Sequence, residues 1–196
     1  FGAEAPDSGE IMLDGQSVRW AGPADAVRRG SGEAQAERHV EGIVAGLNVR
    51  ENMTLAHLDK LRRGPFIDLA CEKALVGSWI ARLGIKPCTA QTPVHHLSGG
   101  NQQKLVLAKW LLGRKPKILI LDHPLRGLDV GAKTEMVLLI RELARSGIGI
   151  LLIADTFDEL VALSDGIIVM KDGVVSGCFP ASTAKPSELQ ILERMV

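Results

Sequence analysis

The stretch ILILDHPLRGLD, Ile118 to Asp129, decides the fold class of this 196-residue chain. Four apolar residues come first, and an acid, Asp122, follows them directly. A second apolar run, Ile150 to Ala154, is likewise followed at once by an acid, Asp155. Strands that are apolar on both faces are typical of parallel sheets, and such sheets bind ligands beyond the carboxyl ends of their strands. The two acids are therefore site candidates, although each could equally do no more than end a strand and begin a turn.

Helices separate these predicted strands. The spacing of apolar residues predicts a helix over residues 132–145, and Ser98 can cap another that runs to Leu112. Ile167 to Met170 is predicted as a third strand. Strands that alternate with helices indicate an α/β fold with a mostly parallel sheet covered by helices on both faces.

Other local patterns describe the rest of the chain. Asp14-Gly15 and Asp172-Gly173 lie between short β-rich runs and predict two tight hairpins, because both turn residues must adopt positive φ. Asn48 and Glu51 have capping-box spacing. We expect residues from about 48 to 84 to be helical, without strands.

Composition excludes some classes of partner. Lys and Arg together number 23, as do Asp and Glu, so nothing in the net charge favours a nucleic acid. No apolar run is long enough to cross a bilayer, and no signal peptide is recognisable. The few cysteines follow no pattern, which favours reduced thiols, as in the cytosol; they are Cys71, Cys88 and Cys178.

The octet LSGGNQQK, Leu97 to Lys104, is the most specific motif in the sequence. Two glycines follow a serine that can cap a helix. The first backbone N–H groups of a helix have no acceptor within it, and the helix dipole favours negative charge there. This pattern predicts an anion site suited to phosphate.

The octet, followed by ILILD and then RGLDVGAK, resembles the ATP-binding subunits of ABC transporters nearly end to end. LSGGNQQK is similar to the signature motif of that family, ILILDHP to its Walker B segment, and residues 127–129 to its D-loop. The details NQQK and RGLDVGAK resemble the second ATPase domain of bacterial monosaccharide importers of the ribose and galactose type.

The resemblance implies that two such domains face each other head to tail. ATP would lie between the P-loop of one domain and the signature motif of the other. The resemblance assigns Mg²⁺ to Asp122, through water. It assigns contacts with the nucleotide to Ser98, Gly99, Gly100, Gln102 and Asp129.

The resemblance also implies partners and a place in the cell. The partners would be a second ABC ATPase domain and membrane permease subunits, at the inner, cytoplasmic face of the cell membrane. Residues 1–196 would form one partial ATPase domain. Within it we expect a helical and signature subdomain over about 48–96, a Walker B core over 97–170, and a C-terminal hairpin and helix over 171–196. The helical subdomain would dock on the permease.

One family element is absent from the sequence. The P-loop pattern G-x-x-x-x-G-K-[ST] occurs nowhere. The chain starts with FGAEAPDSGEI, which resembles the segment just after the family's P-loop helix. We therefore expect a truncated piece without the first strand, the P-loop and its helix, and with little affinity of its own for triphosphate. The apolar sheet surface left uncovered would promote self-association.

Three positions depart from the family pattern. His123 stands where active relatives carry a glutamate that polarises the attacking water, so we expect hydrolysis to be lost or weakened. Asp155 stands where the family's switch histidine usually lies. The segment GSGEAQAERHVEG, residues 30–42, replaces an expected strand and Q-loop; Gly-Ser-Gly-Glu is a poor strand former, and Ala36 falls where a Gln or Glu would reach metal and water.

Two classes of function remain open at this point. The chain is either an ATP-binding component of a sugar importer, or a catalytically silent regulatory or interaction module. A truncated remnant without a role is a third alternative.

Overall fold

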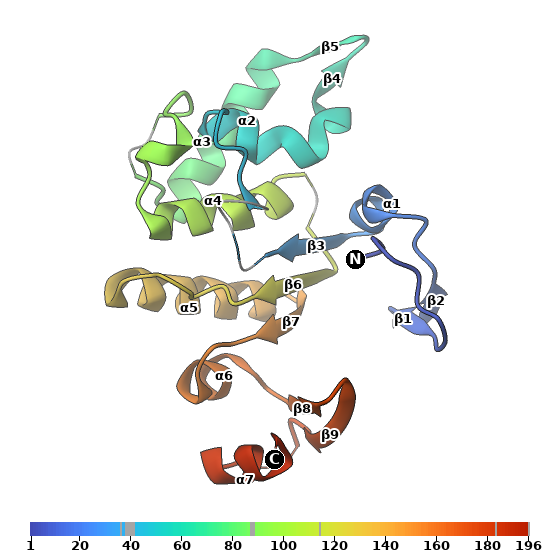
Figure 1. Ribbon diagram of the computed structural model, residues 1–196. Helices are drawn as coiled ribbons and strands as arrows, with labels where there is room; N and C mark the ends of the chain where they lie inside the picture. Colours follow the sequence, from blue (N-terminus) through green and yellow to red (C-terminus); the bar gives the residue numbers. More distant parts are fainter. Residues whose placement is uncertain (36, 38–41, 87–88, 114, 183, 196) are drawn as a thin grey trace.

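The computed structural model describes residues 1–35, 37, 42–86, 89–113, 115–182 and 184–195 (Figure 1). Its central sheet has the order β3-β6-β7, with all neighbours parallel. These strands are β3 (Ser31–Ala34), β6 (Ile118–Asp122) and β7 (Gly149–Ile153). The predicted α/β class with a parallel sheet is confirmed.

The strand β3 contradicts the expectation that Gly-Ser-Gly-Glu would not form a strand. It pairs with β6 from Ser31 opposite Ile118 to Ala34 opposite Leu121. Its glycine is required by packing: a Cβ on Gly32 would lie 2.8 Å from Leu119 Cδ2 and 3.0 Å from Trp110 Cβ. Tertiary packing therefore overrides the low strand propensity of these residues. Ala36, expected at the Q-loop position, lies outside the described residues.

The predicted third strand forms, but in another place. Strand β8 (Ile167–Lys171) pairs antiparallel with β9 (Val174–Phe179) and does not join the parallel sheet in the described part of the chain. The turn between them has φ values of 50° at Asp172 and 80° at Gly173. This hairpin is confirmed, but the assignment of its first strand to the parallel sheet is wrong, because the tight turn supplies a nearer partner.

The second predicted hairpin is also confirmed. Asp14 and Gly15, with φ values of 52° and 73°, connect β1 (Ile11–Leu13) to β2 (Gln16–Val18). In Figure 1 the helical region lies above the central sheet, and the β8–β9 hairpin lies below it.

Helices form where the sequence analysis expects them, from Ser98 to Leu112 and over residues 132–145, and at other places in the chain. They are α1 (Pro23–Arg28), α2 (Val49–Thr54), α3 (Leu69–Leu83), α4 (Gly99–Leu111), α5 (Val130–Arg145), α6 (Phe157–Leu163) and α7 (Glu188–Met195), with 3₁₀ turns η2 (Leu55–Leu61) and η3 (Val94–His96). The region 48–84 is not purely helical, because β4 (Arg62–Arg63) and β5 (Phe66–Ile67) form a small hairpin at its outer end. None of the helices in the described ranges has both the length and the apolar character needed to cross a bilayer.

Helix α4 lies at the centre of the main core. Its Leu105 and Leu107 are fully buried, as are Leu119 and Leu121 of β6, and all belong to one apolar cluster with Met136 of α5. The core therefore joins the sheet, α4 and α5 into one body.

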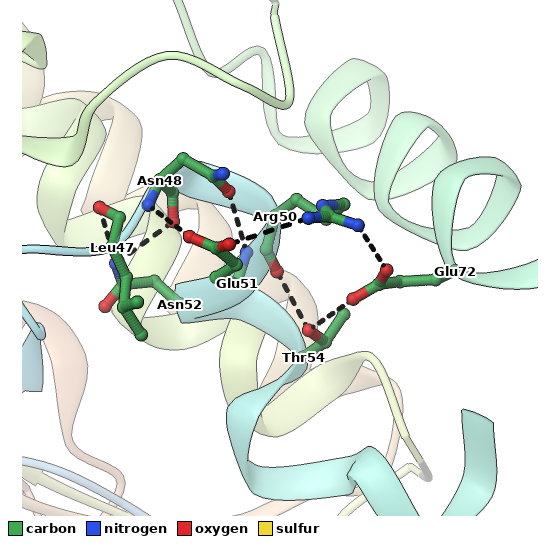
Figure 2. A network of polar contacts seen from close by, with 7 residues as sticks. All are labelled: Leu47, Asn48, Arg50, Glu51, Asn52, Thr54 and Glu72. Carbon is green, nitrogen blue, oxygen red and sulfur yellow. Dashed lines mark hydrogen bonds and ion pairs between the residues drawn. The ribbon is translucent and has the colours of Figure 1, made fainter. Parts of the chain in front are cut away.

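A polar network holds the start of α2 (Figure 2). Asn48 and Glu51 form the predicted capping box, with both reciprocal hydrogen bonds present. The buried Asn52 accepts a hydrogen bond from the N–H of Val44 at 2.8 Å and donates to the carbonyls of Val44, Leu47 and Asn48. The side chain of Asn52 therefore fixes the loop that enters α2.

The same network ties α2 to α3. The carboxylate of Glu72 is almost completely buried, and each of its oxygens has a partner: Arg50 Nη1 at 2.8 Å and Thr54 Oγ1 at 2.9 Å (Figure 2). A buried carboxylate is costly unless it is paired in this way. The burial of the Glu72 carboxylate therefore depends on Arg50 and Thr54, and these contacts link α3 to α2.

Replacing Gly32 by alanine should destabilise the fold. The added Cβ has no room between Trp110 and Leu119, so we expect the free energy of unfolding to fall by about 1–3 kcal/mol. Gly77→Ala is the matched control, because a Cβ there would meet nothing within 4 Å. That exposed helix position should be neutral or gain up to about 1 kcal/mol. Equal urea midpoints for the two variants would refute the close packing of α4 on β3.

Removing the carboxylate of Glu72 should leave the Arg50 guanidinium without its buried partner. We expect Glu72→Ala to lower the free energy of unfolding by about 2–4 kcal/mol, measured by urea denaturation. Glu142→Ala is the matched control: this glutamate also pairs with an arginine, Arg82, at 3.4 Å, but its side chain is 65% exposed. Surface pairs contribute about 0–1 kcal/mol. If the two substitutions cost the same, Glu72 does not link α2 to α3.

Candidate functional site

The serine–glycine turn, Ser98 to Gly100, opens α4. Ser98 is the N-cap residue, is exposed, and has extended backbone angles of φ −63° and ψ 158°. Its carbonyl accepts the N–H of Gln102 at 2.9 Å, which starts the helix, but its hydroxyl makes no capping hydrogen bond to the backbone. The N–H groups of the first turn have no acceptor within the helix. Several backbone donors at this turn therefore remain available to an anion, and the anion site itself stays a prediction.

A close approach of two helices fixes the position of this turn. A Cβ on Gly100 would lie 2.7 Å from the Cβ of Ala132, in the first turn of α5. The N-cap of α5 is the exposed Asp129, whose carboxylate accepts the N–H of Ala132 at 2.9 Å. The structure thus brings together Gly100 and the cap made by Asp129, which the sequence analysis assigned to the same nucleotide.

A second contact between the same helices lies one turn further on. Lys104 Nζ donates to Glu135 Oε2 at 2.6 Å. This hydrogen bond from Lys104 holds the pKa of the Glu135 carboxyl below its usual value. Lys104 is itself only 9% exposed, so its stem packs in the interface. The last residue of the LSGGNQQK octet therefore serves to join α4 and α5.

Gln102, assigned to the nucleotide by resemblance, is turned into the protein. Only 5% of the residue is exposed, and its Nε2 donates to the carbonyl of Val94 at 3.3 Å. A contact with nucleotide would require the side chain to leave this position. Gln102 therefore lies beside the serine–glycine turn in sequence but does not contribute to its surface.

Asn101 is a residue that the sequence analysis missed. Its Nδ2 donates to Ser98 Oγ at 2.9 Å, and its Oδ1 accepts the N–H of Lys86 at 3.0 Å. The signal that could have found it is its spacing, three residues after a capping serine, where a side chain can reach back to the cap.

The sheet-edge group consists of Asp122, His123 and Asp155, at the carboxyl ends of β6 and β7. His123 Nε2 lies 3.4 Å from Asp122 Oδ1, and Nδ1 lies 2.8 Å from Asp155 Oδ1. The second contact is close but does not have the geometry of a regular hydrogen bond. The imidazole thus stands between two partly exposed carboxylates, as expected for residues that end neighbouring parallel strands.

The backbone of His123 is in an uncommon conformation. Its φ is 46°, a left-handed value that few residues other than glycine adopt. Its N–H donates to the carbonyl of Ile153 at 2.9 Å, which extends the pairing of β6 with β7 by one residue. The turn therefore directs the imidazole toward the end of β7, and so toward Asp155.

Asp122 fits a magnesium ion only in part. Its carboxylate is 35% exposed and faces the sheet edge. Within the described ranges, no group of three or more His, Cys, Asp or Glu side chains is arranged to hold a metal ion. Mg²⁺ is usually bound by one or two carboxylates together with water and substrate phosphates. Asp122 could therefore supply one ligand, and the remaining ligands would come from water and a bound phosphate.

The candidate residues fall into two separate groups. The serine–glycine turn lies beside Asp129, and the sheet-edge group lies at the ends of β6 and β7. No hydrogen bond or ion pair between described residues joins one group to the other. The sequence analysis assigns nucleotide contacts to the first group and the metal ion to Asp122 of the second.

The fold is that of a known class of ATPase. The chain superposes on the dimeric post-hydrolysis structure of the ATP-binding cassette MJ0796 bound to ADP and phosphate, with a TM-score of 0.71. The match covers 92% of this chain and 77% of that one, at 20% sequence identity. At this identity the likeness establishes the fold alone.

Curated relatives are much more similar in sequence. The chain is 42% identical to the ribose import ATP-binding protein RbsA of Chromobacterium violaceum, over 93% of this chain and 36% of the relative. It is 41% identical to the arabinose import ATP-binding protein AraG 2 of Burkholderia thailandensis, over 96% of this chain and 36% of the relative. The protein RbsA of Bacillus subtilis is 40% identical over 98% of this chain. The chain spans a little over a third of the length of these relatives.

A family model described as ABC transporter matches residues 1–126, well over half of the chain. The match includes the serine–glycine turn and the first two residues of the sheet-edge group. Fold, relatives and family model agree with the motifs LSGGNQQK and ILILD: this chain belongs to the ABC transporter family.

Proposed function

We propose that this chain is part of the ATP-binding subunit of an ABC-type sugar importer and contributes the serine–glycine turn to an ATP site shared with a second ATPase domain. The observation that carries the proposal is the start of α4: an exposed serine whose hydroxyl accepts no backbone N–H, followed by N–H groups without helical partners. Relatives whose names denote ribose and arabinose import support the class of transport.

In this proposal the chain supplies only part of the ATP site. No P-loop pattern occurs within these 196 residues, and in this proposal the phosphate cradle that faces the serine–glycine turn belongs to the partner domain. Ser98 and Gly99 would donate hydrogen bonds to the phosphates, and Asp129 would lie beside them. Asp122 would hold Mg²⁺ through water. A bound Mg²⁺ ion would neutralise part of the phosphate charge. Gln102 could take part only after leaving Val94.

The proposed partners are a second ABC ATPase domain and membrane permease subunits, at the cytoplasmic face of the membrane. Residues 48–96 would form the part that docks on the permease, 97–170 the core, and 171–196 a C-terminal hairpin and helix. The loop fixed by Asn52 supports a docking role, because it carries the exposed apolar side chain of Val44 next to an ordered α2. Leu55, which directly follows α2, is a second exposed apolar side chain, at 46%.

A second candidate, a silent regulatory module, is supported by His123. An imidazole held beside Asp155 differs in charge and reach from the family's glutamate, so this chain would bind nucleotide with its partner without hydrolysing it efficiently. The two candidates differ in turnover and share the same binding surface.

Titration calorimetry with Mg-ATP tests the shared site. The chain alone should give no measurable binding, since it lacks a phosphate cradle. Mixed with a complete ATPase domain of the sugar-importer type, it should increase that domain's affinity for Mg-ATP by roughly tenfold or more, because a few charge-assisted hydrogen bonds are added. The substitution Ser98→Ala should reduce this gain.

Ser78→Ala is the matched control. Ser78 is also exposed, but it lies within α3 and donates to its own helix at Leu75. It should leave the gain unchanged. Micromolar binding of Mg-ATP by the isolated chain would contradict the expectation that it has no phosphate cradle of its own. If the chain does not increase the Mg-ATP affinity of the partner domain, the shared site is wrong. Mg-ATP hydrolysis by the mixture that is lost with His123→Ala would exclude the silent module.

Self-association is also expected from the uncovered side of the sheet. Leu151 and Ile153 of β7 are 52% and 48% exposed, which is unusual for a strand of a parallel sheet. Light scattering should therefore detect a dimer or larger species at micromolar concentration, and Leu151→Lys with Ile153→Lys should shift it toward monomer. A monomer for the unaltered chain would contradict this expectation.

A further inference from the structure

We propose that Asn101 is a positioning residue that sets the hydroxyl of Ser98 as a hydrogen-bond donor to an anionic oxygen of the nucleotide, and that it connects this hydroxyl to the end of α3. The inference rests on the proposed function of the serine–glycine turn. Asn101 itself is not placed against the nucleotide; it acts through Ser98.

The orientation of the Asn101 amide is determined by a backbone group. The N–H of Lys86 lies 3.0 Å from Oδ1, and a backbone N–H can only donate. The amide oxygen must therefore face Lys86. The other end of the same amide, Nδ2, then faces Ser98 Oγ at 2.9 Å and can only donate. No other orientation of the amide satisfies both neighbours.

The direction of the Ser98 hydroxyl follows from this arrangement. A serine hydroxyl has one proton to donate and two lone pairs to accept with. Nδ2 of Asn101 occupies one lone pair, so the proton cannot point at Asn101. Among the described residues, the hydrogen bond from Asn101 is the one that this hydroxyl makes, so its proton has no protein acceptor there. Because Ser98 is exposed, the proton is directed to the solvent side, where a phosphate oxygen would accept it.

The far end of the link is held rigidly. Lys86 follows the end of α3, where Gly84 adopts the left-handed conformation with φ 59°. The next residue, Ile85, is fully buried, and its N–H donates to the carbonyl of Ile80 at 3.0 Å. This is a common helix C-terminal motif, which fixes the direction of the chain after the helix. The N–H of Lys86 is thus a fixed reference for Asn101.

The link gives α3 an influence on the serine–glycine turn. The first turn of α3 contains Glu72, paired with Arg50 and Thr54 of α2, and its last turn leads to Lys86. A displacement of α3 relative to α4 would therefore break or strain the Asn101 bridge and free the Ser98 hydroxyl to rotate. Through the hydrogen bonds of Asn101 to Lys86 and Ser98, a movement of the helical region would therefore change how well the Ser98 hydroxyl is oriented to donate.

A double-mutant cycle on this chain, mixed with a complete ATPase domain of the sugar-importer type as in the calorimetry above, tests the inference with Mg-ATP as the probe. Asn101→Ala should weaken Mg-ATP binding roughly three- to tenfold, as expected when one oriented hydrogen bond is lost. In the Ser98→Ala background the same change should have no further effect, because Asn101 acts only through Ser98. Asn101→Gln keeps the same donor and acceptor and should restore part of the affinity.

Gln190→Ala provides the matched control. Gln190 is likewise an amide three residues after a capping serine, and its Oε1 accepts the N–H of Ser187 at 2.8 Å at the start of α7. Its removal should leave Mg-ATP affinity unchanged. That result would show that losing an exposed hydrogen-bonded pair at a helix start does not by itself weaken Mg-ATP binding. The Asn101→Ala and Gln190→Ala variants should have similar free energies of unfolding in urea.

The outcomes separate this inference from the proposed function. If Ser98→Ala leaves Mg-ATP affinity unchanged, the proposed site itself is wrong. If Ser98→Ala weakens binding but Asn101→Ala does not, the site stands and the positioning role is overturned. An equal loss from Asn101→Ala with and without Ser98, or a glutamine variant as weak as alanine, would also overturn it.

Discussion

The close approach of α4 to α5 is the constraint on which the rest of the site depends. A Cβ on Gly100 would overlap the Cβ of Ala132, so the two helix starts can meet only at a glycine. Lys104 and Glu135 repeat the contact one turn later. Because α5 begins at the cap made by Asp129, this packing places the serine–glycine turn and Asp129 next to each other. The glycine of the motif is thus required by packing, independently of any ligand.

The contacts of Ser98 also explain why the N–H groups at the start of α4 have no capping partner. Ser98 is held by Asn101 and does not cap the backbone of its own helix. The stability that a capping serine normally contributes, about 1 kcal/mol, is therefore not realised at this hydroxyl. The cost is offset by the buried face of α4, which joins the sheet to the helical region. A donor left unsatisfied in the free protein is available for an anion.

Local signals in the sequence were sufficient for much of this structure. The Asp-Gly pairs predicted both hairpins, and the spacing of Asn48 and Glu51 predicted a capping box, because these features depend on adjacent residues. The strand at Gly32 was not predictable in this way, because it depends on pairing with β6 and on packing against Trp110, both far along the chain. For the same reason the burial of Gln102 and the role of Asn101 were missed. Both depend on contacts with η3 and with the end of α3.

Hydrogen exchange of the first-turn amides of α4 tests the central claim most directly. In this chain mixed with a complete ATPase domain of the sugar-importer type, the N–H groups of Gly99 to Asn101 have no acceptor within the helix and should exchange rapidly without nucleotide. With Mg-ATP they should become protected, while the N–H groups at the start of α7, next to Ser187, should not change. Protection that appears elsewhere in the assembly but not at Gly99 to Asn101 would show that ATP does not bind at this turn.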